Sequence, residues 1–150
     1  MRPRFWERFA LCDLNNREWE ALCDRCGRCC LLKFHTTDDS QVTFTNLSCR
    51  LLNTHTCRCK HYASRNRIVS DCVTLRPDDI EQVITWMPPT CAYRLVHEKR
   101  PLFDWHHLIS GDANSVHEAG ISVRNRCIPE YEGDSDNLER HAVEWPQHMA

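Results

Sequence analysis

Hydrophobic and polar positions alternate with helical spacing between residues 16 and 23, "NREWEALC". Asn15 is a suitable N-cap, and Glu18 stands three residues later, as in a capping box. One face of the predicted helix carries Trp19, Leu22, Cys23 and Cys26. We expect Gly27 to end this helix and to let the chain turn back tightly.

The stretch "RPDDIEQVITWM", residues 76–87, gives the clearest helical pattern. Pro77 suits the first helical position, and Asp78 and Asp79 suit the positive end of the helix dipole. The predicted buried face consists of Ile80, Val83, Ile84 and Met87. Pro88 and Pro89 end the helix.

A further helix is predicted over residues 91–100, "CAYRLVHEKR", which stop before Pro101. Thr90 is the expected N-cap. Cys91 then falls in the first helical turn, where the helix dipole lowers the pKa of a thiol and favours the metal-binding thiolate.

Two short segments have the alternation of a strand, namely residues 41–45, with Val42 and Phe44, and residues 121–124, "ISVR". Residues 46–76 have little periodicity and are expected to form loops. The pattern predicts a small, mainly helical α+β domain over residues 1–129, with short strands and loops organised around a metal site. Residues 130–150 are predicted to form an acidic linker and a C-terminal tail.

Composition and charge narrow the function classes. The chain has 150 residues and a formal net charge of −2. A chain with this charge has no overall positive potential that would attract nucleic acid or an anionic membrane. The N-terminus shows no export signal, and no stretch of eighteen apolar residues follows. We therefore predict a soluble cytoplasmic protein with neither a nucleic-acid nor a membrane partner.

Eleven cysteines are unusual for a cytoplasmic chain, and four of them fall in "CDRCGRCC", residues 23–30. Such a cluster can form disulfides, bind metal or supply a reactive thiol. Disulfide-rich domains are typically short, exported and even in cysteine count, whereas this chain is longer and has an odd count. Metal binding is therefore the favoured interpretation.

Cys23, Cys26 and Cys29 repeat at two-residue gaps, as do three ligands of a [4Fe–4S] cluster in bacterial ferredoxins. The x-x-x-C-P element of those proteins is missing, so a remote cysteine has to complete the site. Successive side chains of an extended backbone point to opposite sides, so Cys29 and Cys30 need not bind the same ion. The run favours an iron–sulfur cluster over zinc, although thiolates suit both.

Six ordered blocks carry a family resemblance: "WEALCDRCGRCCLLK", "FTNLSCRLLNTHTCRC", "DCVTL", "WMPPTCAYRL", "DWHHLISGD" and "VHEAGISVR". They resemble bacterial YcgN-type proteins of the broader YkgJ-type cysteine-cluster superfamily, described as zinc- or iron-chelating domains. The resemblance covers about residues 5–127. It implies metal binding through Cys23, Cys26, Cys29, Cys30, Cys49, Cys57, Cys59, Cys72 and Cys91. Cys12 and Cys127 are predicted not to be ligands, and His106 and His117 match family positions.

The sequence leaves three functions open. The first is a metal-binding protein whose biological role is undefined. The second is a metal-dependent redox or protein-modifying enzyme that uses His106 or His117, although the chain has no nucleotide-binding glycine loop and no hydrolase motif. The third is an adaptor in which zinc staples loops that bind a protein partner of unknown identity. Without a partnering motif, His106, His107 and His117 are interpreted first as packed or surface histidines.

Overall fold

The structure is a computed structural model that describes residues 1–35, 42–64, 67, 76–78, 80–134 and 136–145. It has an α+β fold, as predicted. The described α-helices are α1 (Phe5–Arg8), α2 (Asn16–Ala21), α4 (Ile80–Val83), α5 (Ala92–His97), α6 (His107–Ser110) and α7 (Ser115–Glu118). Short 3-10 helices are η1 (Leu11–Asp13), η2 (Arg28–Cys30), η3 (Tyr62–Ser64), η4 (Ile84–Trp86), η5 (Glu130–Glu132) and η6 (Leu138–His141).

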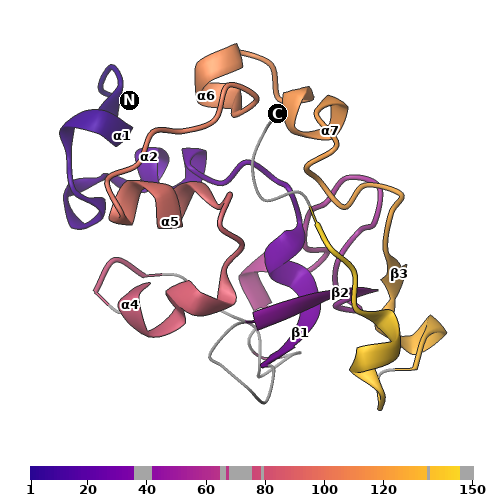
Figure 1. Ribbon diagram of the computed structural model, residues 1–150. Coiled ribbons are helices and arrows are strands. Elements are labelled where there is room, and N and C mark those ends of the chain that lie inside the picture. The colour runs from indigo at the N-terminus through magenta and orange to yellow at the C-terminus, as the bar shows by residue number, and fades with distance from the viewer. Residues whose placement is uncertain (36–41, 65–66, 68–75, 79, 135, 146–150) are drawn as a thin grey trace.

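The strands β1 (Leu31–His35), β2 (Val42–Ser48) and β3 (Ile128–Pro129) form a mixed sheet in the order β1-β2-β3. β1 and β2 are antiparallel, with a bulge between Leu31 and Lys33, and β3 lies parallel to β2. The sheet lies to one side of the molecule, whereas α1, α2 and α5 lie together on the other side (Figure 1). The strand predicted at 41–45 is confirmed from residue 42 onward, whereas β1 was not predicted.

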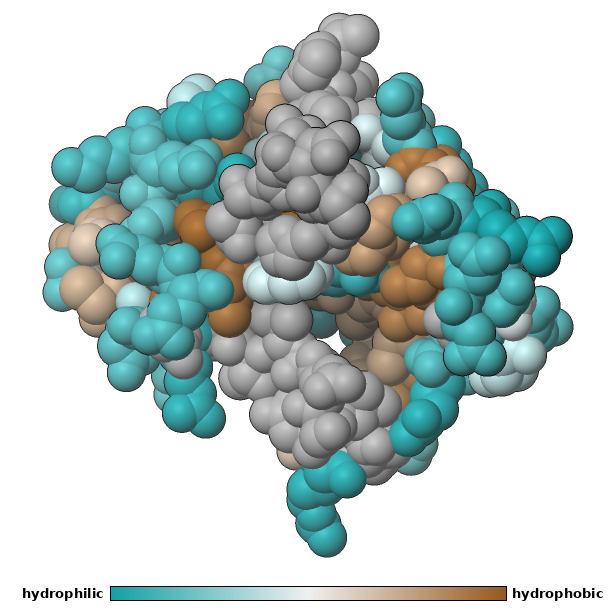
Figure 2. Space-filling view, turned by 60° about the horizontal axis from the view of Figure 1, so that its bottom comes forward, coloured by the Kyte–Doolittle hydropathy of each residue, from teal (hydrophilic) through white to brown (hydrophobic). Residues whose placement is uncertain are grey.

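Three clusters of buried side chains hold these elements together. The first joins α1, α2 and α5 around residues such as Phe5, Leu22 and Leu95. The second lies beside the sheet and includes Leu31, Leu52, Cys57, Val123, Cys127 and Trp145. The third is small and consists of Cys26, Trp105, Val116 and Ile121. On the face shown in Figure 2, hydrophobic side chains lie set back between hydrophilic ones.

The first predicted helix is shorter than its pattern indicates. Asn15 and Glu18 form the predicted capping box, but α2 ends at Ala21 and not at Gly27. Cys23 and Cys26 therefore lie on a loop and not on one helix face. The reason lies in the long-range bonds of the helix end: two histidine side chains hydrogen-bond the carbonyl groups of Ala21 and Leu22, so these carbonyls have partners without another helical turn.

The other two predicted helices are also shorter. Within residues 80–86, α4 passes into the 3-10 helix η4, and Asp79 lies outside the described residues. Ile80 and Met87 are buried as predicted, whereas Val83 and Ile84 are half-buried. α5 begins at Ala92 with Cys91 as its N-cap, so the prediction of Thr90 as N-cap and of Cys91 in the first turn was wrong.

Residues 121–124 do not form the predicted strand. Ile121 and Val123 are buried, which explains the alternation, but they belong to two different clusters. The N–H group of Ile121 donates to Val116 and that of Val123 donates to Cys26, so neither joins a strand ladder. The alternation reflects a buried loop that crosses from one cluster to another.

The last described residues pack along β2. Ala142 forms an isolated bridge with Thr45, and the N–H group of Val143 donates to the carbonyl of Phe44 at 3.1 Å. Trp145 is 5% exposed and belongs to the cluster beside the sheet. The division into residues 1–129 and 130–150 stays a prediction. None of the described helices has the length and apolar composition needed to cross a membrane.

The Glu18 carboxylate gives the fold a pH dependence that can be measured. Arg2 donates to both of its oxygens, at 2.6 and 3.0 Å, and these bonds lower the pKa of Glu18 from 4.5 to about 2. A carboxylate whose pKa is lower in the folded state stabilises that state above pH 4.5 and loses this effect as the pH falls toward 2. We expect the wild type to lose unfolding free energy across this window.

Glu18→Gln should remove this pH dependence and lower stability at neutral pH, because the amide cannot accept the same pair of charged bonds. Denaturant unfolding at several pH values measures both effects. Glu20→Gln is the matched control, since Glu20 is an exposed carboxylate of the same helix. Equal slopes for wild type and Glu18→Gln between pH 4.5 and 2 would contradict the assignment.

Candidate metal centre

The loop that carries the first cysteines is anchored at the end of α2. The His106 ring lies 2.8 Å from the carbonyl oxygen of Leu22, and the His107 ring lies 2.7 Å from that of Ala21. The Tyr93 hydroxyl donates to the carbonyl of Trp19 at 2.6 Å. These bonds fix the chain immediately before Cys23, from elements that lie more than 70 positions further along the sequence.

The backbone then turns at Gly27, between Cys26 and Cys29. The N–H group of Cys26 donates to the Asp24 carboxylate at 3.0 Å, and Gly27 adopts a positive φ of 77°. The carbonyl of Cys26 accepts from Val123 at 2.9 Å. Glycine suits this position because its backbone enters the left-handed region without a steric penalty.

Four cysteines line one cavity of about 60 Å³. The turn supplies Cys23, Cys26 and Cys29, and the start of α5 supplies Cys91. Asp24, Met87, Pro88 and Tyr93 complete most of the wall. The volume is several times the ~10–15 Å³ that one water requires, so the space between the sulfurs accommodates an ion or a small cluster.

The chemistry of the wall fits a metal. Oδ2 of Asp24 is buried, and none of the described residues offers it a hydrogen bond. A cation in the cavity would offset this carboxylate. As they stand, no three His, Cys, Asp or Glu side chains of the described segments are placed to hold one ion. Metal binding in this cavity would therefore require the cysteine sulfurs to move closer together.

Burial is the main influence on the pKa of three of these thiols, and it favours their protonated form. It raises the pKa of Cys23 to about 12 and raises the pKa values of Cys26 and Cys91 well above their ordinary range, with the Asp24 charge adding to each. The expected lowering of the Cys91 pKa was therefore wrong, because desolvation outweighs the N–H groups that act on its sulfur. A metal cation would have to displace these protons, so uptake should strengthen as pH rises.

Cys29 differs from the other three. A hydrogen bond from the Cys30 thiol is the main reason that the pKa of Cys29 falls to about 7, and the Lys33 ammonium group acts in the same direction. Lys33 is held near by bonds from its Nζ to the carbonyls of Cys29 and Trp86, at 2.9 and 3.2 Å. Of the four thiols that line the cavity, Cys29 therefore has the largest thiolate fraction at neutral pH and is the first that we expect to bind a cation.

The remaining predicted ligands lie apart from this cavity. Cys30 packs against the cluster beside the sheet that contains Cys57 and Cys127, while its thiol hydrogen-bonds the Cys29 sulfur, so Cys30 lies between the cavity and that cluster. Cys49 and Cys59 interact electrostatically with each other, as do Cys57 and Cys127. Cys72 lies outside the described residues, and Cys12 is exposed in η1.

The histidines support the loops. Nδ1 of His106 accepts from the N–H group of Leu108 at 3.1 Å, so its Nε2 carries the proton and donates to Leu22. Both ring nitrogens are thus engaged. Nδ1 of His117 lies 2.6 Å from the Ser122 hydroxyl, which in turn bonds the Cys57 thiol. The interpretation of these residues as packed histidines agrees with these contacts.

Sequence reasoning missed two features of the site. Asp24 lies inside the cysteine run, but its burial and its place in the cavity wall were not predicted. Lys33 supplies a positive charge beside Cys29, and the sequence analysis did not single out this residue. Arg28, which lies between Cys26 and Cys29 in the chain, is buried and donates to the carbonyl of Ile121 at 2.8 Å.

Comparisons with known proteins agree with a metal-binding cysteine cluster. Residues 22–92 match a family profile described as "Putative zinc- or iron-chelating domain". UPF0260 proteins of Allorhizobium ampelinum, Rhizobium leguminosarum and Nitrobacter hamburgensis are 47%, 50% and 50% identical to this chain. Each match covers 95% of this chain and 89%, 88% and 83% of the relative. The chain belongs to the UPF0260 family.

Membership of UPF0260 covers almost the whole chain, whereas the chelating profile ends one residue after Cys91. The profile therefore spans all nine cysteines that were predicted as ligands and excludes Cys12 and Cys127. No solved structure matches the chain.

Proposed function

We propose that this UPF0260 protein is a cytoplasmic metal-binding protein whose first centre is formed by Cys23, Cys26, Cys29 and Cys91. The observation that carries the proposal is the shared cavity, which gathers these four cysteines from two segments of the chain. Within the described residues every cysteine is a free thiol, which suits ligands in a reducing compartment. The buried Asp24 carboxylate adds to the demand for a cation.

An iron–sulfur cluster is our first choice for the bound group, ahead of zinc. Three ligands from one C-x-x-C-x-x-C run and a fourth from a remote element form a three-plus-one set, as in cluster-binding proteins. The N–H group of Arg28 lies 3.5 Å from the Cys26 sulfur, and such bonds stabilise metal-bound thiolates. Zinc would be held by the same four sulfurs in a closed tetrahedron.

Cys30, Cys49, Cys57, Cys59 and Cys72 stay predicted metal ligands, and we propose that they belong to a second centre. The loop that carries three of them is tied to the end of the cysteine run, because the N–H group of Cys49 donates to the carbonyl of Cys30 at 2.7 Å. With four sulfurs engaged at each centre, neither metal would offer an open position for a substrate. We therefore propose a binding protein and not an enzyme.

Metal analysis of the protein as isolated tests the proposal. We expect protein purified without oxygen from metal-replete cells to contain iron and acid-labile sulfide, about four of each per cluster, and to be brown. Colourless protein with about one zinc ion per four thiolates would support the same centre with the second metal. A well-folded protein that contains neither metal would overturn the proposal.

A further inference from the structure

Two neighbouring loops carry positive charge and no carboxylate. They are residues 49–64, which hold Cys49, Cys57 and Cys59, and residues 119–129. Together they contain five of the chain's 19 Lys and Arg residues and none of its 21 Asp and Glu residues. The remaining residues have 14 basic and 21 acidic side chains, which is an excess of seven negative charges. The charge of the protein is therefore strongly asymmetric, although its net value is small.

Hydrogen bonds hold the two loops side by side. Nε of Arg124 donates to the carbonyl of His55 at 2.5 Å. The N–H group of Asn125 donates to the carbonyl of Thr54 at 2.9 Å. The Arg124 guanidinium group, which comes from the second loop, therefore lies against the first loop, where its charge acts on the Cys57 thiol.

Four cations of these loops form what we call the basic surface, namely Arg58, Lys60, Arg124 and Arg126. Three of them are exposed, and Arg124 is half-buried. Arg58 and Lys60 stand on either side of Cys59, which forms an isolated β-bridge, and side chains two positions apart in an extended segment point to the same side. Arg124 and Arg126 donate to backbone carbonyls, which are neutral and leave the guanidinium charge in place.

Carboxylates do not cancel the charge of the basic surface. No ion pair within the described residues includes any of its four side chains. Glu130, which follows the second loop, accepts instead from the backbone N–H group of Arg50 at 3.0 Å. Glu20 accepts from the Tyr62 hydroxyl at 3.4 Å. The two carboxylates that border the loops thus bind other groups.

Metal at the proposed second centre would leave most of this charge in place. Four thiolates around a divalent ion have a net charge of about −2, whereas the two loops carry five positive charges. The cations of the basic surface also reach the solvent, where a partner can contact them.

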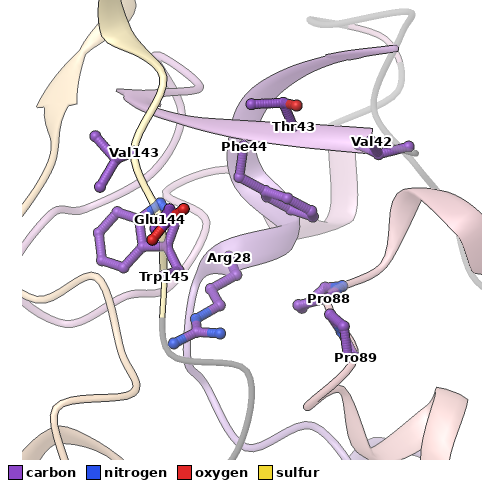
Figure 3. Close-up of a pocket in the computed structure, with 9 residues that line it drawn as sticks. All are labelled: Arg28, Val42, Thr43, Phe44, Pro88, Pro89, Val143, Glu144 and Trp145. Carbon is purple, nitrogen blue, oxygen red and sulfur yellow. The ribbon is translucent and has the colours of Figure 1, made fainter. Parts of the chain in front are cut away.

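Arg28 does not contribute to this surface. It is 1% exposed, and Figure 3 shows its side chain in a cavity between Trp145 on one side and two prolines on the other. The charges of Asp24 and Cys26 act on its guanidinium group. Arg126 is exposed, with its guanidinium carbon 5.1 Å from the centre of the same Trp145 ring. A partner at the surface would therefore meet Arg126 and not Arg28.

The distribution of charge favours one class of anionic partner. A guanidinium group binds a carboxylate through two parallel hydrogen bonds, so arginines suit Asp and Glu side chains. A nucleic acid or an anionic membrane would extend past the basic surface and meet the negative remainder of the chain, which would repel it. A short acidic segment needs to contact only the two loops.

We propose that the basic surface binds an acidic segment of a partner protein. This inference goes beyond metal binding and does not depend on which metal is bound, because the cations that carry it are not metal ligands. It also gives a chemical character to the partner, which the sequence leaves undefined. Its failure would leave the proposed metal centres untouched.

Fluorescence anisotropy of the full chain with a dye-labelled peptide of eight glutamates tests the proposal. We expect saturable binding with a Kd below about 0.1 mM at about 50 mM salt, and binding at least about tenfold weaker at about 300 mM salt. A peptide of eight glutamines should not bind. No saturable binding of the glutamate peptide, equal binding of the glutamine peptide, or tighter binding of a single-stranded thymidine octanucleotide would overturn the proposal.

Charge reversal locates the site. Arg58→Glu and Lys60→Glu should each weaken peptide binding at least about fivefold, because each replaces an attraction by a repulsion. Arg8→Glu is the matched control, since Arg8 is exposed in α1, across the molecule from the sheet, and the change in net charge is the same (Figure 1). Equal weakening by Arg8→Glu would show an effect of net charge alone and refute the assignment.

Metal content, measured on the same samples, separates this proposal from the proposed metal centres. Arg58 lies between two predicted ligands, so Lys60→Glu decides the matter if Arg58→Glu loses metal. We expect Lys60→Glu to keep its metal and to lose peptide affinity. If Lys60→Glu keeps both its metal and its full affinity for the peptide, the basic surface is not the binding site.

Discussion

Cys26→Ser is expected to leave the protein with little or no metal at its first centre. Cys26 is buried, lines the cavity together with Cys23, Cys29 and Cys91, and receives an N–H bond on its sulfur. Changes around a metal site that leave every ligand in place already cost about 10–100-fold in affinity, so loss of a ligand should cost at least about 100-fold. Elemental analysis per folded chain measures the result.

Stability should fall with the metal, because the binding free energy of a structural site contributes directly to folding. Thermal unfolding of Cys26→Ser with and without added metal tests this coupling, and added metal should stabilise the wild type alone. Without that coupling, the cysteines would be buried thiols whose role is packing.

Two further cysteine substitutions separate the centres. Cys12→Ser is the control, since Cys12 is exposed in η1 and outside both groups. Cys59→Ser removes a predicted ligand of the second group and should leave the metal of the first centre in place. If Cys59→Ser depletes the protein as completely as Cys26→Ser, the cysteines act as one shared site and the division that we propose is wrong.

The cysteine run and the α+β class could be predicted because both depend on local features. The capping box of Asn15 and Glu18 is set by residues three positions apart, and the strand that begins near Val42 follows from alternation. The grouping of Cys91 with the run was expected from family resemblance, and the shared cavity agrees with it. Each of these features can be read within one short window or one matched motif.

The helix ends and the interior of the site could not be predicted, because distant contacts decide them. α2 ends before Cys23, where His107 hydrogen-bonds the carbonyl of Ala21 and His106 hydrogen-bonds the carbonyl of Leu22. "ISVR" has the alternation of a strand, yet its two apolar residues enter different clusters. The pKa of Cys91 follows its burial and not its place beside a helix, and burial depends on the whole fold.

Gly27→Ala is expected to destabilise the protein strongly, although it adds a single methyl group. Gly27 has a φ of 77°, which costs a non-glycine residue about 1–2 kcal/mol. The new Cβ would also lie 2.7 Å from Cγ2 of Val123, a fully buried side chain that cannot move aside freely. Overpacking of this kind costs about 1–3 kcal/mol, so we expect a total loss of about 2–5 kcal/mol in unfolding free energy.

Gly111→Ala separates the two causes. Gly111 has the same φ of 77°, but no atom of the described residues lies within 4 Å of the added Cβ, so we expect only the backbone cost of about 1–2 kcal/mol. Denaturant unfolding of both variants measures the difference. In the Gly27→Ala background, Val123→Ala should cost less than it does alone, because it removes the methyl group that the new Cβ meets.

The consequence for metal binding follows from the position of Gly27, which lies between Cys26 and Cys29 and against Cys57. An added Cβ would stand 2.7 Å from Cγ2 of Val123 and 3.4 Å from the Cβ atom of Cys57, so the clash with Val123 would have to shift a turn that also contacts the second group of cysteines. We therefore expect Gly27→Ala to lose metal together with stability, whereas Gly111→Ala should keep its metal. A Gly27→Ala protein as stable and as metal-loaded as Gly111→Ala would show that the close packing of this turn does not shape the centre.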